Sequence, residues 1–388
     1  MALLSYTWLL LKMCLRFGIM VINNLVAIPS YLLYLLALLP LRLCRPRLFW
    51  ELEGVMFKWL LAIVASWGWV AGYTVVEWGA DVAAIAEDQA LVMVNHQSTG
   101  DICTLMMCLQ DKGTTIRHIM WVMEHIFKFT NFGLVSWVHG DFFIKQGKAH
   151  REHQVELLRH HLGRVFRPRA RRWLVLFPEG GFLRKRRETS QRYATRLGLP
   201  ALRHVTLPRL GAAHAVLHTL SRPRPAAAAA AQGATPASSC LNGGAWETPK
   251  DGARGDARGA TEAGMRWVID VTIAYPNADP MDIQTWVLGY RPPITTHVHY
   301  RLYPVSEVPL EMEALTKWMY QRFIEKEHLL DYFYTTGAFP AQAGETGDAP
   351  SRAMVLDPWW LLMCQLWCFL SGYMWFSLLR YICYGFIL

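Results

Sequence analysis

Two side chains capable of acid/base chemistry stand five positions apart in the string NHQSTGD, residues 95–101. A neutral imidazole can take a proton from an alcohol when a carboxylate binds its other ring N–H and stabilises the imidazolium that forms. His96 and Asp101 are therefore a candidate general-base pair. Because this spacing also arises by chance, the elements around the pair must decide between a reaction centre and an ordinary polar turn.

These elements favour a site. Residues 90–94 (ALVMV) predict a buried strand, and residues 102–109 (ICTLMMCL) predict a helix with Ser98 or Thr99 as its N-cap. His96 and Asp101 would then flank one tight strand-to-helix connection.

A second polar turn, Pro178-Glu179-Gly180-Gly181, follows the apolar run 173–177 (WLVLF). In open α/β sheets ligands bind beyond the carboxyl ends of the strands, so two such turns are expected to share one cleft. Glu179 could accept hydrogen bonds from substrate hydroxyls or orient nearby donors, and the glycines would let the backbone approach a ligand. An ordinary polar turn is the alternative.

Basic residues follow directly at 184–187 (RKRR), and the chain carries a net charge of +9. A basic run that opens a helix beside such a turn can bind a substrate phosphate, the phosphates of a carrier or lipid headgroups, and these three remain open. The wider basic set, with Lys145 and the arginines of 151–172, is expected to face a membrane.

Composition indicates a membrane protein with a substantial polar domain, because 53% of residues are hydrophobic and only 18% are charged. Three uncharged stretches are long enough to consider as spans, namely 17–40, 59–76 and 358–379. The second is short for a span and would equally suit a helix lying partly in one leaflet. We therefore expect an N-terminal membrane region at 1–79 and, after a linker, a C-terminal span within 341–388.

Residues 80–340 predict one α/β domain with a mostly parallel central sheet and flanking helices, because strand and helix patterns alternate there. Expected helices are 116–129, 148–162 and 311–333, short β-rich runs lie within 133–144, and expected strands include 205–207, 266–275 and 297–303. The stretch 221–264 is dominated by Pro, Ala, Gly and Ser and predicts a disordered insertion.

Other chemistries find less support. Cys103, near the first turn of the helix after Asp101, could be a nucleophile, but a buried core cysteine is the more common case. The histidines at 150, 153, 160, 161, 297 and 299 fall on a helix and a distant strand, so we predict no metal site. Neither a G-x-S-x-G elbow, a C-x-x-C pair nor a Walker loop occurs in the sequence.

The order of the motifs resembles that of glycerophospholipid acyltransferases that use acyl-CoA. It runs from His-x4-Asp through GDFFI (140–144) and FPEG (177–180) to a strand ending at Pro208, and it covers roughly residues 80–340. The longer strings NHQSTGDICTLMMCLQDKG, FPEGGFLRKRRETS, VTLPRLGA, DVTIAYP and THVHYRLYP resemble the branch that acylates lysophosphatidylglycerol.

The resemblance implies a role for each block. His96 would be the base and Asp101 its partner, and the segments 140–146 and 179–187, with Gly140, Glu179, Gly180 and Gly181, would contact the acceptor's phosphate and glycerol. Pro208 would lie near the donor or the apolar acyl site. Two arginines of the family pattern are missing. Gln146 stands where many members have the first, and Gly181 and Phe182 stand where many members have Thr or Ser followed by the second. Lys145 and Arg184 are the candidate substitutes.

We therefore expect an enzyme that moves an acyl chain from acyl-CoA to the free hydroxyl of a lysophospholipid, lysophosphatidylglycerol or a relative such as lysophosphatidylethanolamine. A thioester is already activated, so no acyl-enzyme or cofactor beyond acyl-CoA is needed, and backbone N–H groups at the start of the helix at Asp101 could bind the oxyanion. A neutral acceptor such as monoacylglycerol and a non-catalytic lipid-binding protein are the alternatives. We expect no nucleic-acid partner. The resemblance implies a multi-pass protein of the endoplasmic reticulum membrane. The acylated position, the acyl length, the orientation and the oligomeric state are left open.

Overall fold

One eight-stranded sheet organises the chain. The structure, a computed structural model, describes residues 2–221, 264–341 and 347–387. The strands are β1 (Thr74–Gly79), β2 (Ala90–Val94), β3 (Ile119–Glu124), β4 (Phe142–Ile144), β5 (Trp173–Leu176), β6 (Trp267–Ala274), β7 (Thr295–Pro304) and β8 (Ser351–Ala353). They pair in the order β4-β3-β5-β2-β6-β7-β1-β8, in which β6 with β7 and β1 with β8 are antiparallel and the other five pairs are parallel. This confirms the predicted α/β fold with a mostly parallel sheet.

Strand β2 lies at the centre of the sheet and is buried on both faces. Val92 and Val94 belong to one apolar cluster, and Leu91 and Met93 to another. Successive side chains of a strand point to opposite faces, so a strand covered on both sides has a continuous apolar sequence. This is why ALVMV shows no polar alternation.

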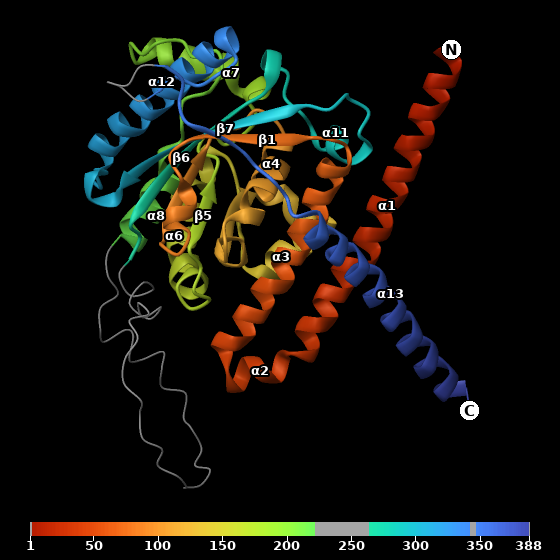
Figure 1. The fold of residues 1–388 in the computed structure, drawn as a ribbon. Coiled ribbons are helices and arrows are strands. Elements are labelled where there is room, and N and C mark those ends of the chain that lie inside the picture. The colour runs from red at the N-terminus through yellow and green to blue at the C-terminus, as the bar shows by residue number, and fades with distance from the viewer. Residues whose placement is uncertain (1, 222–263, 342–346, 388) are drawn as a thin grey trace, which may run out of the picture.

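Helices cover both faces of the sheet (Figure 1). The helices are α1 (Ala2–Ala37), α2 (Leu39–Cys44), α3 (Pro46–Val70), α4 (Gly100–Cys108), α5 (Asn131–His139), α6 (Arg151–His161), α7 (Leu183–Arg196), α8 (Leu210–Leu220), α11 (Ile283–Leu288), α12 (Met312–Thr336) and α13 (Pro358–Ile387). Side chains of α3 and α4 pack in the cluster on one face, and those of α6, α8 and α12 pack in the cluster on the other. The domain is therefore a three-layer sandwich of helices, sheet and helices.

The apolar segment 59–76 does not form a single element. Helix α3 ends at Val70, a turn follows, and Thr74 begins β1, which pairs with β7 and β8. Residues 59–66 are all buried, and α3 packs against α1, α4 and α13. Packing of residues 59–66 against neighbouring elements accounts for much of the apolar composition. The expectation of a span over 59–76 was wrong, because residues 74–76 belong to β1. A helix lying partly in one leaflet stays a prediction for α3.

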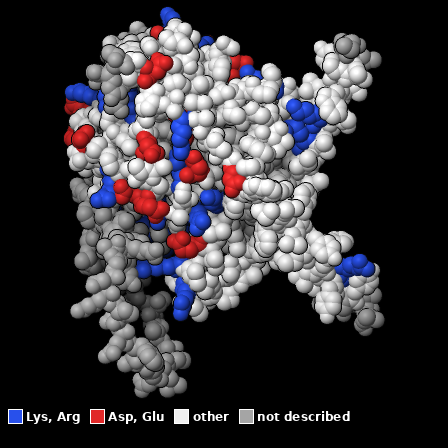
Figure 2. Space-filling view, in the orientation of Figure 1, with Lys and Arg blue, Asp and Glu red and all other residues white. Residues whose placement is uncertain are grey.

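Two described helices are long and apolar enough to cross a membrane, Leu4–Ala37 within α1 and Pro358–Tyr384 within α13. They contain the predicted segment 358–379 and most of the predicted segment 17–40. Both project from the sheet domain, and they pack against each other where they cross (Figure 1). Figure 2 shows Lys, Arg, Asp and Glu side chains spread over the sheet domain, whereas each of these helices is white apart from one patch of basic residues on the visible face.

The sheet extends beyond the predicted domain boundaries. Strand β1 comes from the part assigned to the membrane region and β8 from the part assigned to the linker. The predicted disordered insertion, 221–264, lies almost entirely outside the described residues.

Three local predictions were wrong. The predicted helix 116–129 contains β3, whose residues 119–122 are buried between two parallel neighbours. Within 133–144 the structure has helix α5 before β4, with Thr130 accepting a hydrogen bond from the Gly133 N–H and Gly140 as a left-handed cap. The predicted strand 205–207 is a buried loop, because its N–H groups bind side chains and not a neighbouring strand.

Candidate active site

Three neighbouring parallel strands, β5, β2 and β6, end at the same edge of the sheet. Glu179 follows β5, His96 follows β2, and Tyr275 follows β6. Parallel strands place their carboxyl ends together, which is where open α/β sheets bind ligands. The sheet therefore assembles one site from residues up to 179 positions apart in the sequence.

His96 and Asp101 form a hydrogen-bonded pair. The distance from His96 Nδ1 to Asp101 Oδ2 is 2.9 Å, and Asp101 is fully buried. Because a buried carboxylate accepts, Nδ1 carries the proton, and the lone pair is left on Nε2. Nε2 has no hydrogen-bond partner among the described residues, and the His96 side chain is 11% exposed. This is the arrangement that a general base requires.

The Asp101 carboxylate is held by three further donors. The Gln97 and Ser98 N–H groups donate to Oδ2 at 2.7 and 2.9 Å, and the Tyr275 hydroxyl donates to Oδ1 at 2.7 Å. Hydrogen bonds from several donors fix the position of a buried carboxylate. Asp101 thus presents a fixed acceptor to the imidazole.

The turn that carries the pair is tied to the segment before α11. The Ser98 hydroxyl and the Gly100 N–H both donate to the Met281 carbonyl, and the Ile283 N–H donates to the Thr99 hydroxyl. A Cβ at position 100 would lie 2.1 Å from the Met281 oxygen, so only glycine fits.

These bonds also correct an expectation about the oxyanion. The N–H groups of Gly100 and Asp101 at the start of α4 donate to the carbonyls of Met281 and Ser98. They are therefore not free to bind a substrate oxyanion.

Glu179 is fully buried and binds the backbone of the turn that contains His96. Its Oε1 accepts from the His96 N–H at 2.7 Å, and its Oε2 accepts from the Thr206 N–H and hydroxyl. Burial raises the pKa of Glu179 to about 8, while the bonds from Thr206 and His96 act in the opposite direction. The position favours the second role expected of Glu179, orienting donors, over direct contact with a substrate hydroxyl.

Gly180 and Gly181 adopt φ values of +67° and +152°, which favour glycine. A Cβ at Gly180 would lie 3.0 Å from the Arg209 side chain, and one at Gly181 would lie 3.0 Å from Arg186. The two glycines thus let two arginines lie against the turn. Burial and then the neighbouring Arg186 lower the pKa of Arg209, and burial lowers that of Arg186.

The sequence interpretation missed Arg209 as a site residue. It included Arg186 in the basic run 184–187, but from that run it selected Arg184, which is exposed on the first turn of α7. Arg186 is partly buried, and its Nε is buried without a hydrogen-bond partner in the described part of the chain. Helical phase separates the two, because residues two apart on a helix point in different directions.

Three further residues were predicted to contact the substrates, namely Lys145, Pro208 and Gly140, and the structure places them in different parts of the domain. Lys145 is exposed after β4 and its N–H donates to Gln154, while Pro208 is buried in the loop beside Glu179. Gly140 lies at the amino end of β4, away from the carboxyl edge, where it ends α5 and its carbonyl binds His161. The structure does not bring Gly140 to the site.

Cys103 is fully buried, and burial followed by the charge of Asp101 raises its thiol pKa to about 12. A thiol of this kind is not a nucleophile at neutral pH.

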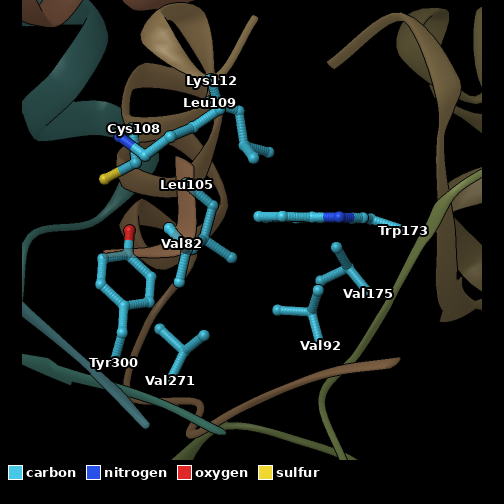
Figure 3. Close-up of a pocket in the computed structure, with 10 residues that line it drawn as sticks. All are labelled: Val82, Val92, Leu105, Cys108, Leu109, Lys112, Trp173, Val175, Val271 and Tyr300. Atoms are coloured by element: carbon cyan, nitrogen blue, oxygen red, sulfur yellow. The ribbon is translucent and has the colours of Figure 1, made fainter. Parts of the chain in front are cut away.

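A small apolar cavity lies between α4 and the sheet (Figure 3). The side chains that line it come from α4, β2, β5, β6 and β7 and from the short segments at Val82 and at 109–112, and the Tyr300 hydroxyl points toward Cys108 (Figure 3). Its volume of about 10 Å³ has room for about one water molecule and not for an acyl chain.

Two family models match the chain, Acyltransferase over residues 80–227 and Acyltransferase C-terminus over residues 286–363. The chain is 54% identical to acyl-CoA:lysophosphatidylglycerol acyltransferase 1 of Mus musculus and of Homo sapiens, over 96% of this chain and 95% of each relative. It is 22% identical to 1-acyl-sn-glycerol-3-phosphate acyltransferase 2 of Brassica oleracea, over 78% of this chain and 69% of that protein. No solved structure matches the chain. On its sequence and on the family models that it matches, the chain belongs to the acyltransferase family.

Proposed function

We propose that the protein transfers a fatty acyl chain from acyl-CoA to the free hydroxyl of a lysophospholipid, with lysophosphatidylglycerol as the first acceptor to test. The observation that carries this proposal is the His96–Asp101 pair, with its open Nε2 at the edge of the sheet. The names of the mouse and human relatives supply the donor and the acceptor.

The reaction needs one proton transfer and one stabilised oxyanion. The acceptor's hydroxyl gives its proton to His96 Nε2 while its oxygen attacks the thioester carbonyl, and a base of this kind contributes ~10²–10⁴ in rate. The C–S bond then breaks and the thiolate takes the proton from the imidazolium. The N–H groups of Gly181 and Phe182, which have no hydrogen-bond partner among the described residues, are our candidates for binding the oxyanion.

We assign the acceptor's phosphate to Arg186 and Arg209. Two guanidinium groups beside one glycine turn repel each other, and an anion between them relieves that repulsion. Arg209 also donates to Gln146 Oε1 at 2.9 Å, so a guanidinium lies at a position where many members of the resembled family have arginine.

The test of the function uses full-length protein purified in detergent. Acyl-CoA is offered with lysophosphatidylglycerol, lysophosphatidylethanolamine or monoacylglycerol, and labelled product is measured for the wild type and for His96→Ala against a blank without protein. We expect transfer to the phosphorylated acceptors and none above the blank from His96→Ala. Faster transfer to monoacylglycerol would favour the neutral-acceptor alternative, and lipid binding without CoA release from any pair would favour a non-catalytic protein.

The phosphate assignment has a matched control on the same helix. Replacing Arg186 or Arg209 by Gln is expected to lower kcat/KM for lysophosphatidylglycerol about tenfold through KM, a typical effect of losing one charge-assisted contact. Arg184→Gln, whose side chain is exposed, should have little effect. An equal loss in Arg184→Gln would contradict the assignment.

We also propose that both terminal helices hold the protein in a membrane, that of the endoplasmic reticulum. The support is the length and composition of the two helices and their exposed apolar residues, and the family resemblance for the compartment. The protein should resist extraction by alkaline carbonate and co-localise with a marker of that compartment. Release into the soluble fraction would contradict a membrane-spanning role for the helices.

A further inference from the structure

The proposed reaction sets a problem of selectivity. A base beside a thioester can deprotonate water as readily as it deprotonates an alcohol, and closed sites suppress such hydrolysis by excluding water. The sheet edge must therefore keep water away from His96 when no acceptor is bound.

Two aromatic rings cover the imidazole. The Phe177 ring centroid lies 4.2 Å from that of His96, and the Phe182 centroid lies 4.4 Å from it. Together with Asp101 on Nδ1, they leave the His96 side chain only 11% exposed. Nε2 is not among the buried unpartnered atoms of the described residues, so the two rings narrow the approach to it without closing it.

The two phenylalanines differ in what else they do. Phe177 packs against the large apolar cluster that contains α3 and α4, so it belongs to the core. Phe182 is half-buried and is part of none of the three apolar clusters in the described residues. Its ring contact with His96 is therefore not a by-product of core packing.

Phe182 is also held in place relative to the base. It is the N-cap residue of α7, and the N–H of the next residue, Leu183, donates to the His96 carbonyl at 2.8 Å. On the other side, Gly181 has a φ of +152°, which directs the chain sharply out of the turn. The backbone therefore positions the Phe182 ring over the imidazole.

We propose that Phe182 is a positioning residue that excludes water from His96 and so directs the acyl group to the lipid acceptor. The proposal rests on His96 being the base. The acceptor's glycerol would displace the ring, whereas a lone water molecule offers too little contact to do so. Without the ring, water adds to the thioester carbonyl as His96 takes its proton, the C–S bond breaks, and the thiolate takes that proton, giving a free fatty acid and CoA.

The test measures how the acyl group divides between two products. Full-length protein in detergent receives labelled acyl-CoA with and without lysophosphatidylglycerol, and labelled fatty acid and phospholipid are separated. We expect the ratio of fatty acid to phospholipid to rise on the order of tenfold in Phe182→Ala, because the site is open to water. Phe182→Leu keeps an apolar cover and should give a smaller rise, and the double variant Phe182→Ala/His96→Ala should form neither product.

The product ratio is a readout that a merely structural role would not move. If Phe182→Ala loses transfer with no rise in the hydrolysed fraction, the proposal is overturned. Should the alanine variant not fold, the leucine variant alone decides, and a ratio equal to wild type overturns the proposal. Failure of the proposed function would look different, because the wild type itself would then transfer no acyl group to lysophosphatidylglycerol, and failure of the base assignment would appear as transfer by His96→Ala alone.

Discussion

Among the described residues, two histidine–carboxylate pairs have both side chains buried, and one of these two can supply a base. His139 Nδ1 lies 2.5 Å from Glu53 Oε1, closer than the 2.9 Å between His96 and Asp101. However, His139 Nε2 lies 2.9 Å from the Ile119 carbonyl, and Nδ1 lies 3.1 Å from Arg171 Nη2 in addition to its contact with Glu53, so protein atoms occupy both ring nitrogens. His139 therefore has no nitrogen free for a substrate, whereas His96 Nε2 has no hydrogen-bond partner among the described residues.

The surroundings of the Glu53 pair show its role. Arg171 and Tyr31 also bind the Glu53 carboxylate, and Phe57 stacks on His139 with ring centroids 3.5 Å apart. The charges of His139 and Arg171 outweigh burial and lower the pKa of Glu53 to about 2. This cluster joins α1, α3 and α5 to the sheet domain. A histidine bound to a carboxylate can act as a base only when its second ring nitrogen is free, whatever the distance between the histidine and the carboxylate.

The largest effect is expected from Asp101→Asn. An amide can donate to Nδ1 and so place the proton on Nε2, which should lower kcat by ~10²–10⁴ with the fold retained. Initial rates of CoA release measure this, and Asp279→Asn, at an exposed carboxylate paired with Arg291, is the control. A rate above one half of wild type would remove Asp101 from the mechanism.

The second prediction concerns Glu53→Gln. Removing this carboxylate leaves the charge of Arg171 buried without its partner and removes the hydrogen bond to His139, which costs about 3–5 kcal/mol of stability. Glu51→Gln, on the same helix but with a half-exposed side chain near His118, should cost less than about 1 kcal/mol. Thermal unfolding in detergent measures both, and the rate per folded molecule should not change in either. A lower rate in folded Glu53→Gln would make the two pairs functionally alike.

Acidification should weaken the same cluster. The pKa of Glu53 is lower in the folded chain, so its stabilising contribution is present above its ordinary value of 4.5 and is lost as the pH falls toward about 2. The unfolding temperature of the wild type should therefore fall below pH 4.5 more steeply than that of Glu53→Gln. Parallel curves for the two proteins would contradict the assignment.

The smallest effect is expected from Tyr275→Phe. It removes one hydrogen bond of 2.7 Å to Asp101 Oδ1, and a loss of about 1–1.5 kcal/mol corresponds to about a tenfold lower kcat. Tyr300→Phe is the matched control, since that buried hydroxyl binds Glu77 away from His96. Equal rates in the two variants would show that Tyr275 does not support the dyad.

The two turns that carry the site were predictable from the sequence, because each follows an apolar strand. His96 and Asp101 belong to the turn after one strand and Glu179 to the turn after another, and strand ends in a parallel sheet meet at one edge. Tyr275 was not predicted, because its position depends on β6 pairing with β2, and strand order is not a local property. The Glu53–His139 pair spans 86 positions and has no local pattern either.

Contacts with distant parts of the chain explain why some elements were predicted wrongly from the local sequence. Residues 205–207 have strand-like composition, but their N–H groups bind the side chains of Glu327, Glu179 and Ser190. The segment 59–76 is apolar because residues 59–66 lie in the protein core. In both cases the tertiary environment, which the local pattern does not contain, decides the structure.

The central claim is that His96, and not His139, carries the chemistry. The most direct test compares acyl transfer to lysophosphatidylglycerol by His96→Ala and His139→Ala, each at a temperature where its folded fraction is measured and near one. We predict that His96→Ala transfers no more than the blank while folded His139→Ala keeps the wild-type kcat. Substantial turnover by His96→Ala, or loss of turnover in folded His139→Ala, would contradict this account.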